Sequence, residues 1–312
     1  MSKLAFVFPG QGSQSVGMGK SFFESFDIAR KTFEEANDAL GFDIARLSFE
    51  GPQEEIDKTE ITQPALLTAS IAALRVLNEK TDLKPAYLSG HSLGEYTALV
   101  AAGSLEFRDA VKLVHLRGKF MQESVPQGVG RMCAILGLGI EDVQVICDSA
   151  SIDAARVVPA NINSPEQIVI SGHAAAVEIA ANLAKERGAK RVVPLQVSAP
   201  SHSPLMEAAA ERLAEELNKI TFKDFNIPVL TNVEAKPLSD ASKIKGLLKD
   251  QLTSPVRWVD IIRRMKQDGV ANIIEVGPGK VLTGLIKRIE KEINSFNLNE
   301  ASELEKITTA FQ

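Results

Sequence analysis

The motif Gly-His-Ser-Leu-Gly at 90–94 constrains this chain more than any other stretch. It ends a short apolar run and precedes a helical pattern, so Ser92 stands at a sharp strand-to-helix turn. Glycines two positions on either side let neighbouring backbones approach and lift the serine side chain into the open. The spacing predicts a nucleophile elbow, and a tight turn with an incidental serine is the alternative.

Short apolar runs alternate with helical patterns along much of the chain. The runs that are typical of buried parallel strands lie at 4–8, 86–90, 227–233 and 272–277. The helical segments lie at 63–80, 107–124 and 203–220, the last with Ser203 as expected N-cap and Pro204 at the first helical position. This alternation predicts an α/β domain with a mostly parallel sheet, whose ligands collect at the carboxyl ends of the strands.

The rhythm changes between about 129 and 198. Strand patterns at 131–138, 155–163, 167–172 and 191–197 enclose helical patterns at 141–150 and 174–188. The order β-α-β-β-α-β is that of a ferredoxin-like unit. We therefore expect a small subdomain at 129–198, inserted into a core of 1–128 and 199–312 and closing one side of its cleft.

Composition narrows the function classes. The chain has 312 residues, 45% of them apolar, and a net charge of -5, which argues against general nucleic-acid binding. No apolar run reaches the roughly 18 residues that span a bilayer, and the start lacks a signal-peptide pattern, so we expect a cytoplasmic protein without membrane contact. Cys133 and Cys147 form no CxxC pair and are expected to be buried, reduced thiols.

A nucleophilic serine needs a base, and the chain contains four histidines. His115 falls on the polar side of its helix, His173 belongs to the small subdomain, and His91 points away from Ser92 if the elbow is sharp. His91 is then a structural or cleft-lining residue. His202 remains, where a helix begins, and the positive end of that helix keeps an imidazole neutral. A histidine at a helix start without chemistry is the alternative.

The glycine-rich loop at 8–19 could be mistaken for a phosphate cradle. It fits neither nucleotide-binding pattern, and 277–284 also fails both. Its backbone amides are better suited to a reacting carbonyl oxygen. We expect the Gln11 and Leu93 N–H groups to form an oxyanion site at the positive end of the helix after Ser92.

A cation falls on the apolar side of the helix at 107–124. At 100° per residue, Arg117 lies in the middle of the arc formed by Ala110, Val111, Leu113, Val114, Phe120 and Met121. A guanidinium stays charged in proteins, and burying it alone costs several kcal/mol. It needs an anion, which is either an internal Asp or Glu or a substrate carboxylate bound through two parallel hydrogen bonds. With a nucleophilic serine, the second case implies an acyl group ending in a carboxylate, such as malonyl.

These residues together resemble the malonyl-CoA:acyl carrier protein transacylase family, over essentially the whole chain. The matching stretches are FPGQGSQ, ITQPAL, GHSLGEYTALVAAG, LRGKFMQ, NINSPEQIVISG, SHSPLM, QLTSPVRW and EVGPGKVLTGL. The resemblance implies an α/β-hydrolase-like core with a ferredoxin-like subdomain. It also implies ping-pong transfer from malonyl-CoA to the phosphopantetheine thiol of acyl carrier protein, through a malonyl-serine intermediate and without a cofactor or metal.

Position by position, the resemblance implies Ser92 as nucleophile, His202 as base and Arg117 as the malonyl-carboxylate site. The oxyanion hole is then formed by Gln11 and Leu93. The main-chain carbonyl of Gln251 orients the histidine in place of a buried acid. Weaker assignments to the substrate-binding cleft wall are Gln63, Asn232 and His91. Malonyl-selective relatives often carry an aromatic residue where this chain has Ser201, so strict exclusion of methylmalonyl is not implied.

Rival functions share the elbow. A serine thioesterase or esterase uses the same nucleophile, base and oxyanion site, but needs no fixed cation in its acyl pocket, so Arg117 favours a transferase. A non-catalytic acyl-binding protein is a second rival. Fatty-acid synthesis is the expected pathway and polyketide assembly the alternative.

An acidic carrier protein needs a basic surface. The candidate patches are Lys185, Arg187, Lys190 and Arg191, and, separately, Lys280, Lys287 and Arg288, and for each the alternative is a solvated face without a partner.

Overall fold

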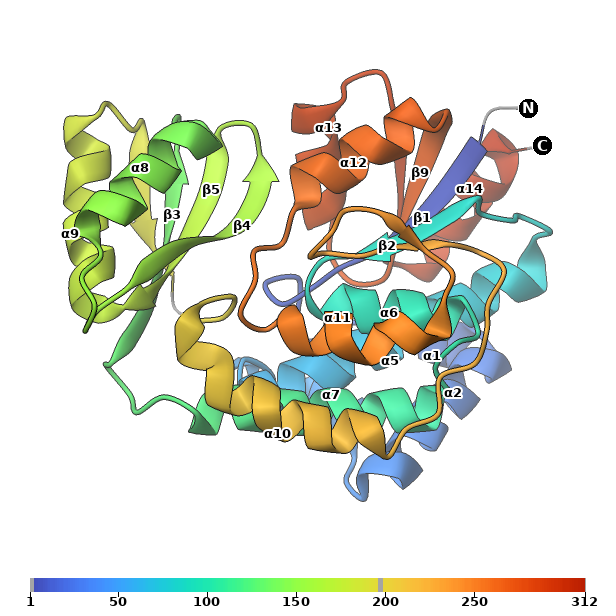
Figure 1. Ribbon diagram of the computed structural model, residues 1–312. Coiled ribbons are helices and arrows are strands. Elements are labelled where there is room, and N and C mark those ends of the chain that lie inside the picture. Colours follow the sequence, from blue (N-terminus) through green and yellow to red (C-terminus); the bar gives the residue numbers. More distant parts are fainter. Residues whose placement is uncertain (1–2, 196–198, 312) are drawn as a thin grey trace.

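Two β-sheets lie side by side in the computed structural model, which describes residues 3–195 and 199–311 (Figure 1). One sheet has six mostly parallel strands, and the other has four antiparallel strands. The chain is therefore a mixed α/β protein, as the sequence predicts. The end of the strand expected at 191–197 and the boundary at residue 198 fall outside the described residues.

The six-stranded sheet has the order β10-β9-β1-β2-β7-β8, and only β7 and β8 pair antiparallel. Its strands are β1 (Lys3–Phe8), β2 (Tyr87–Gly90), β7 (Val229–Leu230), β8 (Pro237–Leu238), β9 (Val270–Val276) and β10 (Asn294–Leu298). The prediction at 227–233 was too long, because only Val229 and Leu230 pair. The strands β8 and β10 were not predicted.

Helices cover both faces of this sheet (Figure 1). Phe6 and Phe8 of β1 pack into one core with α2, α5 and α7, while Ala5 and Val7 face α12 and α13. The helices of this part are α1 (Lys20–Ser25), α2 (Asp27–Leu40), α3 (Ile44–Glu50), α4 (Gln53–Ile56), α5 (Thr59–Lys80), α6 (Leu93–Ala101), α7 (Phe107–Glu123), α10 (Glu207–Asn218), α11 (Ile244–Asp250), α12 (Trp258–Gln267), α13 (Val281–Ile289) and α14 (Leu304–Ala310).

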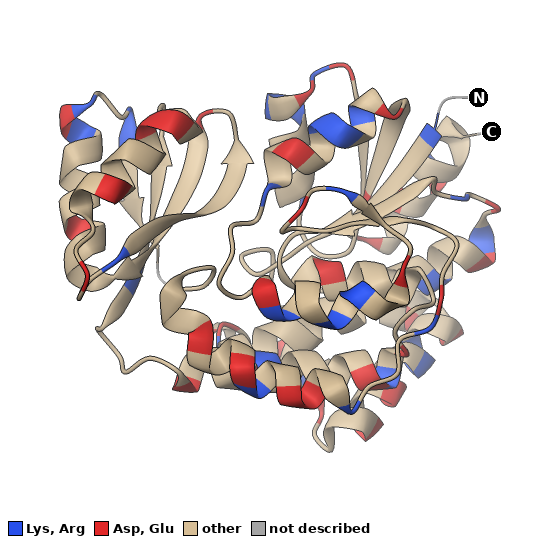
Figure 2. Ribbon diagram, viewed as in Figure 1, with Lys and Arg blue, Asp and Glu red and all other residues tan. Residues whose placement is uncertain are grey.

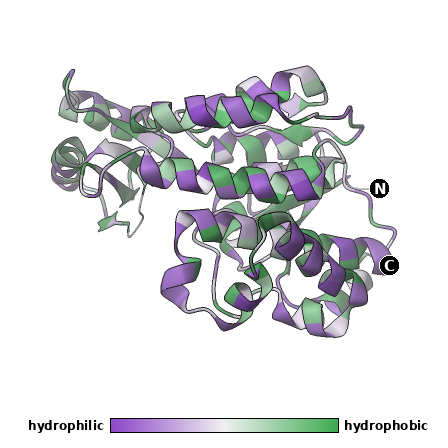
Figure 3. Cartoon of the chain, turned by 90° about the horizontal axis from the view of Figure 1, so that it is seen from below, coloured by the Kyte–Doolittle hydropathy of each residue, from purple (hydrophilic) through white to green (hydrophobic). Residues whose placement is uncertain are grey.

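Seen from below, these helices carry apolar and polar bands side by side (Figure 3). Both signs of charge are distributed over their outer surfaces (Figure 2). No helix within the two described ranges is long and apolar enough to cross a membrane.

The helix expected at 203–220 begins differently from the prediction. A short 3₁₀ turn, Pro204–Met206, precedes α10, and Pro204 does take the first position. Ser203 does not cap it through its side chain, because its hydroxyl donates to the carbonyl of Pro200 at 2.7 Å. The serine thus stabilises the bend before the helix.

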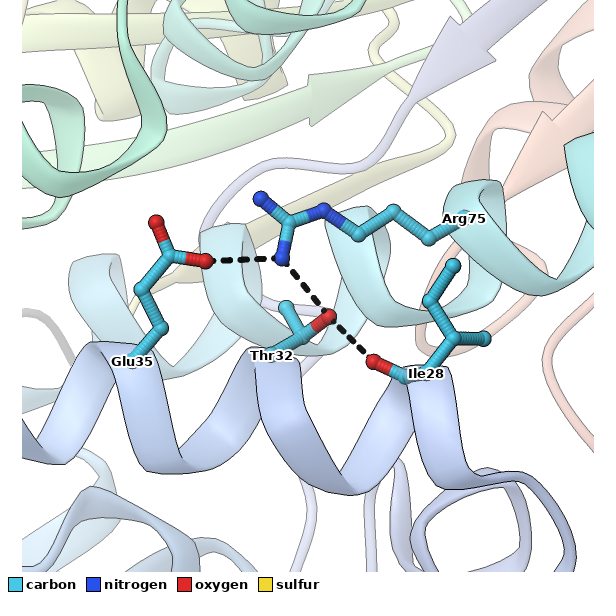
Figure 4. Close-up of polar contacts among 4 residues, drawn as sticks. All are labelled: Ile28, Thr32, Glu35 and Arg75. Atoms are coloured by element: carbon cyan, nitrogen blue, oxygen red, sulfur yellow. Dashed lines mark hydrogen bonds and ion pairs between the residues drawn. The ribbon is translucent and has the colours of Figure 1, made fainter.

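Polar contacts of Arg75 join the helices α2 and α5 of the core (Figure 4). Arg75 of α5 donates to Glu35 of α2 at 2.8 Å and to the Thr32 hydroxyl at 3.0 Å. Thr32 in turn donates to the carbonyl of Ile28 at 2.7 Å. The guanidinium also lies 4.8 Å from the ring centre of Phe107, the first residue of α7. The helix that carries Arg117 is therefore anchored to its neighbours at its start.

The four-stranded sheet has the order β4-β5-β3-β6. Its strands are β3 (Gly130–Leu136), β4 (Val157–Ser164), β5 (Gln167–His173) and β6 (Arg191–Pro194), and its helices are α8 (Ile140–Ala150) and α9 (Ala174–Glu186). One face packs on both helices, with Cys133 and Cys147 free and buried in that core. The other face, with Met132 and Ala134, is turned towards the larger part.

A parallel backbone bridge joins the two parts. Val256 accepts from the amide of Ile162 on β4 and donates to the carbonyl of Ala160, both at 2.9 Å. The segment that follows α11 is therefore joined at Val256 to β4, the edge strand of the smaller sheet.

Candidate active site

Ser92 occupies the turn between β2 and α6 in a strained backbone conformation. Its φ is 50° and its ψ is -103°, a region that costs a non-glycine residue about 1–3 kcal/mol. Glycine is required on both sides, because a Cβ on Gly90 would overlap the backbone of Gly94, and one on Gly94 would overlap the carbonyl of Phe8. The Ser92 amide donates to Asn232 Oδ1 at 2.7 Å, which stabilises the turn.

Ser92 and His202 are in direct contact. Ser92 Oγ lies 2.8 Å from His202 Nε2. On the other side of the ring, Nδ1 lies 2.7 Å from the carbonyl of Gln251 and 3.2 Å from that of Ser254. Because carbonyls only accept, Nδ1 carries the proton and Nε2 accepts from the serine hydroxyl. This is the geometry that a base needs, with backbone carbonyls in place of a carboxylate.

Burial keeps the imidazole of His202 neutral. The side chain is 2% exposed, and desolvation, followed by the charge of Arg117, lowers its pKa to about 3. The sequence-based prediction attributes the neutral ring to the start of a helix, but α10 starts only at Glu207. The two largest causes are instead burial and the charge of Arg117. The neutral form is therefore set by the surrounding core.

The reactivity of Ser92 is expected to change little between pH 8 and pH 5. A pKa near 3 leaves His202 deprotonated over this whole interval, and the base is lost only as the pH falls towards that value. The rate at which an uncharged fluorophosphonate labels Ser92 measures this. An imidazole with an ordinary pKa would lose about 30-fold over the same interval. A decrease of that size would contradict the buried, neutral base.

Arg117 of α7 is buried, with 1% of its surface exposed, and it contacts neutral groups. Its Nη2 donates to Ser92 Oγ at 3.1 Å and to Gln251 Oε1 at 3.0 Å, and its Nη1 donates to Gln63 Oε1 at 2.8 Å. The ring of Tyr96 lies 5.3 Å from the guanidinium carbon. Within the described ranges, no Asp or Glu forms an ion pair with it. The alternative of an internal salt bridge is thus wrong, and a cation lies beside the serine hydroxyl.

A cavity of about 330 Å³ opens over these groups. Its wall combines both parts of the molecule, since Met132, Asn161 and Leu195 come from the smaller one. From the larger part it contains Gln11, Gly12, Gln14, Asp57, Thr59, His91, Ser92, Leu93, Arg117, Met121, Ala199, Ser201 and His202. The amides of Gln11 and Leu93 have no hydrogen-bond acceptor among the described residues. Two free donors are therefore available at the cavity.

Two residues expected in the cleft wall lie behind it. Gln63 and Asn232 are fully buried and are absent from the cavity wall. Gln63 contacts Arg117, whereas Asn232 accepts from the Ser92 amide and donates to the carbonyl of Gly90 at 2.7 Å. We correct their assignment from substrate contact to support of the residues that line the cavity.

The other histidines have separate partners. His91 lines the cavity, with Nε2 2.8 Å from Asn163 Oδ1 of β4 and its ring 5.7 Å from that of Trp258. His115 Nδ1 lies 2.8 Å from the carbonyl of Glu60, which Pro64 cannot bond four residues later. His173 contacts the backbone of Arg156. The elimination that left His202 therefore agrees with the structure.

Sequence reasoning missed Glu95 and the side chain of Gln251. Gln251 Nε2 donates to Glu95 Oε2 at 2.7 Å and to the carbonyl of Ser92 at 3.0 Å. Glu95 is 2% exposed. A charged residue one turn after Ser92, directly before the largely apolar stretch 96–101, was the signal that could have identified it.

A Ser–His pair on a strand-to-helix elbow, above a mostly parallel sheet, is typical of enzymes that move acyl groups. The model of the family described as "Acyl transferase domain" matches residues 5–308. Malonyl CoA-acyl carrier protein transacylase of Escherichia coli (strain K12) is 51% identical over 302 residues, 97% of each chain. The protein of that name from Bacillus subtilis (strain 168) is 48% identical over 98% of this chain and 96% of its own. The chain belongs to the malonyl-CoA:acyl carrier protein transacylase family.

Solved structures agree with this membership. An acyl carrier protein S-malonyltransferase from Vibrio cholerae O1 superposes with a TM-score of 0.96 at 48% identity, over 98% of this chain and all of that one. A malonyl-transacylase in complex with its type II PKS acyl-carrier protein gives 0.96 at 45% identity, over 99% of this chain and 100% of that one.

Proposed function

We propose that this protein transfers the malonyl group of malonyl-CoA to the phosphopantetheine thiol of acyl carrier protein, for fatty-acid synthesis. The relatives named above support the reaction. The single observation that supports the substrate is Arg117, a buried cation 3.1 Å from the serine hydroxyl whose hydrogen-bond partners among the described residues are all neutral. A carboxylate at the far end of the acyl group supplies the missing anion.

In the first half-reaction, Ser92 Oγ attacks the thioester carbonyl while its proton passes to His202 Nε2. The carbonyl oxygen becomes an oxyanion, which accepts from the Gln11 and Leu93 amides. The C–S bond then breaks, and His202 gives its proton to the CoA sulfur. In the second half-reaction the carrier thiol loses its proton to His202 and attacks the ester, and Ser92 leaves with that proton.

Two neighbouring positions tune the site in this proposal. His91 and Ser201 line the cavity, and Ser201 offers a small side chain where an aromatic one would narrow the space next to His202. Methylmalonyl is therefore not strictly excluded.

We also infer that the smaller sheet is a ferredoxin-like subdomain, 129–198, beside an α/β-hydrolase-like core, 1–128 and 199–312. The strand order β4-β5-β3-β6 supports this. The cytoplasmic location and the lack of a cofactor stay predictions.

Covalent loading of Ser92 tests the proposed function. Brief mixing with malonyl-CoA should add one malonyl group to Ser92, detected by peptide mass spectrometry, and adding phosphopantetheinylated carrier protein should remove it. Equal consumption of malonyl-CoA with and without carrier protein would indicate a hydrolase. Absence of the adduct in folded protein would leave only binding.

The carrier protein docks, in this proposal, on a groove between the two parts. The groove encloses about 560 Å³, and parts of both predicted basic patches line it, namely Lys190, Arg191, Lys287 and Arg288, together with Lys291. Lys190 is paired with Glu166 at 2.9 Å. Arg191, Lys287 and Lys291 form no ion pair within the described ranges. Lys185, Arg187 and Lys280 do not line the groove.

Reversing the free charges should slow only the second half-reaction. We expect Arg191→Glu with Lys287→Glu to leave malonylation of Ser92 unchanged and to slow its discharge onto carrier protein by about 10-fold, since surface charges mainly set association rates. Rapid-quench measurement of each half-reaction checks this. Lys185→Glu, outside the groove, is the matched control. An equal effect of the control, or none of the pair, would contradict this docking surface.

A further inference from the structure

Glu95 is a buried carboxylate that the proposed reaction does not use. It lies on α6, three residues after Ser92, and is 2% exposed. Its Oε2 accepts from Gln251 Nε2 at 2.7 Å and from the main-chain N–H of Asn232 at 3.0 Å. It lines neither the cavity nor the groove, so it meets no substrate. Burial of a carboxylate is costly, which makes its partners informative.

Gln251 connects Glu95 to Ser92, His202 and Arg117. Its main-chain carbonyl holds His202 Nδ1, its Nε2 donates to the carbonyl of Ser92, and its Oε1 accepts from Arg117 Nη2. An amide has a donor end and an acceptor end. If Gln251 turned over, its NH₂ group would face the guanidinium, which only donates. The orientation of this one side chain therefore decides whether Arg117 Nη2, the nitrogen that donates to Ser92 Oγ, has its second acceptor, while Gln63 holds Nη1.

Glu95 selects that orientation. Its Oε2 accepts hydrogen bonds from the main-chain N–H of Asn232 and from Gln251. Because this oxygen is an acceptor, it binds the NH₂ end of the Gln251 side chain and not its oxygen. The same oxygen fixes the backbone of Asn232, whose Oδ1 accepts from the Ser92 amide. Asn232 binds the Ser92 amide and Gln251 binds the Ser92 carbonyl. Both residues are thus held by the same oxygen of Glu95.

The charge of Glu95 stays close to Arg117 without neutralising it through contact. The Gln251 amide separates the two groups. Burial raises the pKa of Glu95 to about 7, while its hydrogen bonds and the charge of Arg117 lower it. Since Oε2 accepts in the ionised form and as the carbonyl of the acid, the two hydrogen bonds exist in both states. The positioning therefore depends on the acceptor oxygen, and an amide can replace the carboxylate.

We propose that Glu95 is a positioning residue of the acyl-transfer site: it fixes the Gln251 amide so that its oxygen holds Arg117 beside Ser92. The inference rests on the proposed function. It identifies a buried carboxylate that acts on Arg117 through the Gln251 amide and not by direct contact.

Glu95→Ala tests the proposal through acyl selectivity. We expect the ratio of Ser92 loading by malonyl-CoA to loading by acetyl-CoA to fall by about 10- to 100-fold, the range for a misplacement of about 1 Å. Glu95→Gln should restore most of the ratio, because its side-chain oxygen can accept both hydrogen bonds. The matched control is Glu275→Ala, which removes a buried carboxylate that instead accepts from Leu282 and Thr283 of α13. It should lower stability without altering the ratio.

Gln251→Leu provides a second measurement if Glu95→Ala does not fold. It keeps the carbonyl that holds His202 but removes the amide, and should reproduce the loss of selectivity. A folded Glu95→Ala or Gln251→Leu with the wild-type ratio overturns the proposal, as does a Glu95→Gln variant as defective as Glu95→Ala. The outcome is separable from the proposed function, because failure of that function shows as absence of the malonyl adduct in the wild type.

Discussion

Replacing His202 by alanine is expected to slow malonylation of Ser92 by about 10²- to 10⁴-fold, the usual contribution of a general base. Nε2 lies 2.8 Å from the serine hydroxyl, and two backbone carbonyls on Nδ1 hold the ring in the accepting tautomer. Without the ring, the proton of Ser92 has no neutral acceptor at this position. Single-turnover release of CoA, followed by quenching within milliseconds, measures the loss.

His173→Ala is the matched control, since His173 contacts Arg156 in the smaller sheet and lies outside the cavity. It should load at the wild-type rate. A folded His202→Ala variant that loads Ser92 within 5-fold of the wild type, roughly 1 kcal/mol in activation free energy, would show that another group takes the proton.

Replacing Arg117 by alanine should reduce the preference for malonyl over acetyl by about 30-fold or more, because losing one partner of a buried charge pair costs at least about 2 kcal/mol. In the described part of the chain the guanidinium contacts Ser92, Gln63 and Gln251 and no carboxylate, so we expect a substrate anion to provide the opposite charge. An acetyl group has no carboxylate, so its transfer loses no contact with Arg117 in this variant. Competition between the two thioesters for Ser92, read by mass spectrometry, gives the ratio directly.

Two variants separate charge from packing. Arg117→Lys keeps the cation but not the paired donors, and should keep part of the preference. Arg264→Ala removes an arginine of α12 that binds Asp268 and does not line the cavity, and should keep all of it. An unchanged ratio in Arg117→Ala would exclude this residue from acyl recognition.

Two main members of the site could be found from sequence because each is unusual within its own segment. Ser92 stands between glycines at a turn, and Arg117 occupies an apolar arc. These are features that a linear pattern contains. His202 was instead reached by elimination among four histidines. The resemblance to the transacylase family then added Gln251 through its carbonyl.

The supporting contacts could not be predicted, because they join segments far apart in the chain. Glu95 and Gln251 meet across 156 residues, and Asn232 reaches Ser92 across 140. In sequence, Ser92 and Glu95 have the spacing of a capping box, which offers a local explanation for the acid. The pKa of His202 likewise depends on the core assembled around it rather than on the nearby helix start.

The fold predictions failed where strands are short or polar. The stretch 294–298 has three polar residues and only two apolar ones, so β10 has no strand signal of its own and is defined by pairing with β9. At 227–233 the strand ends after Leu230, and two residues later Asn232 accepts from the Ser92 amide at the elbow instead of pairing in the sheet.

The backbone bridge at Val256 limits how this protein can be recombined with its relatives. The stretch from Gln251 to Val256 supplies both carbonyls on the His202 ring and also pairs with β4. A chimera that exchanges residues 129–198 alone would set a foreign strand against this stretch and disturb the imidazole indirectly. Domain-swap libraries should therefore transplant 251–258 together with the smaller sheet.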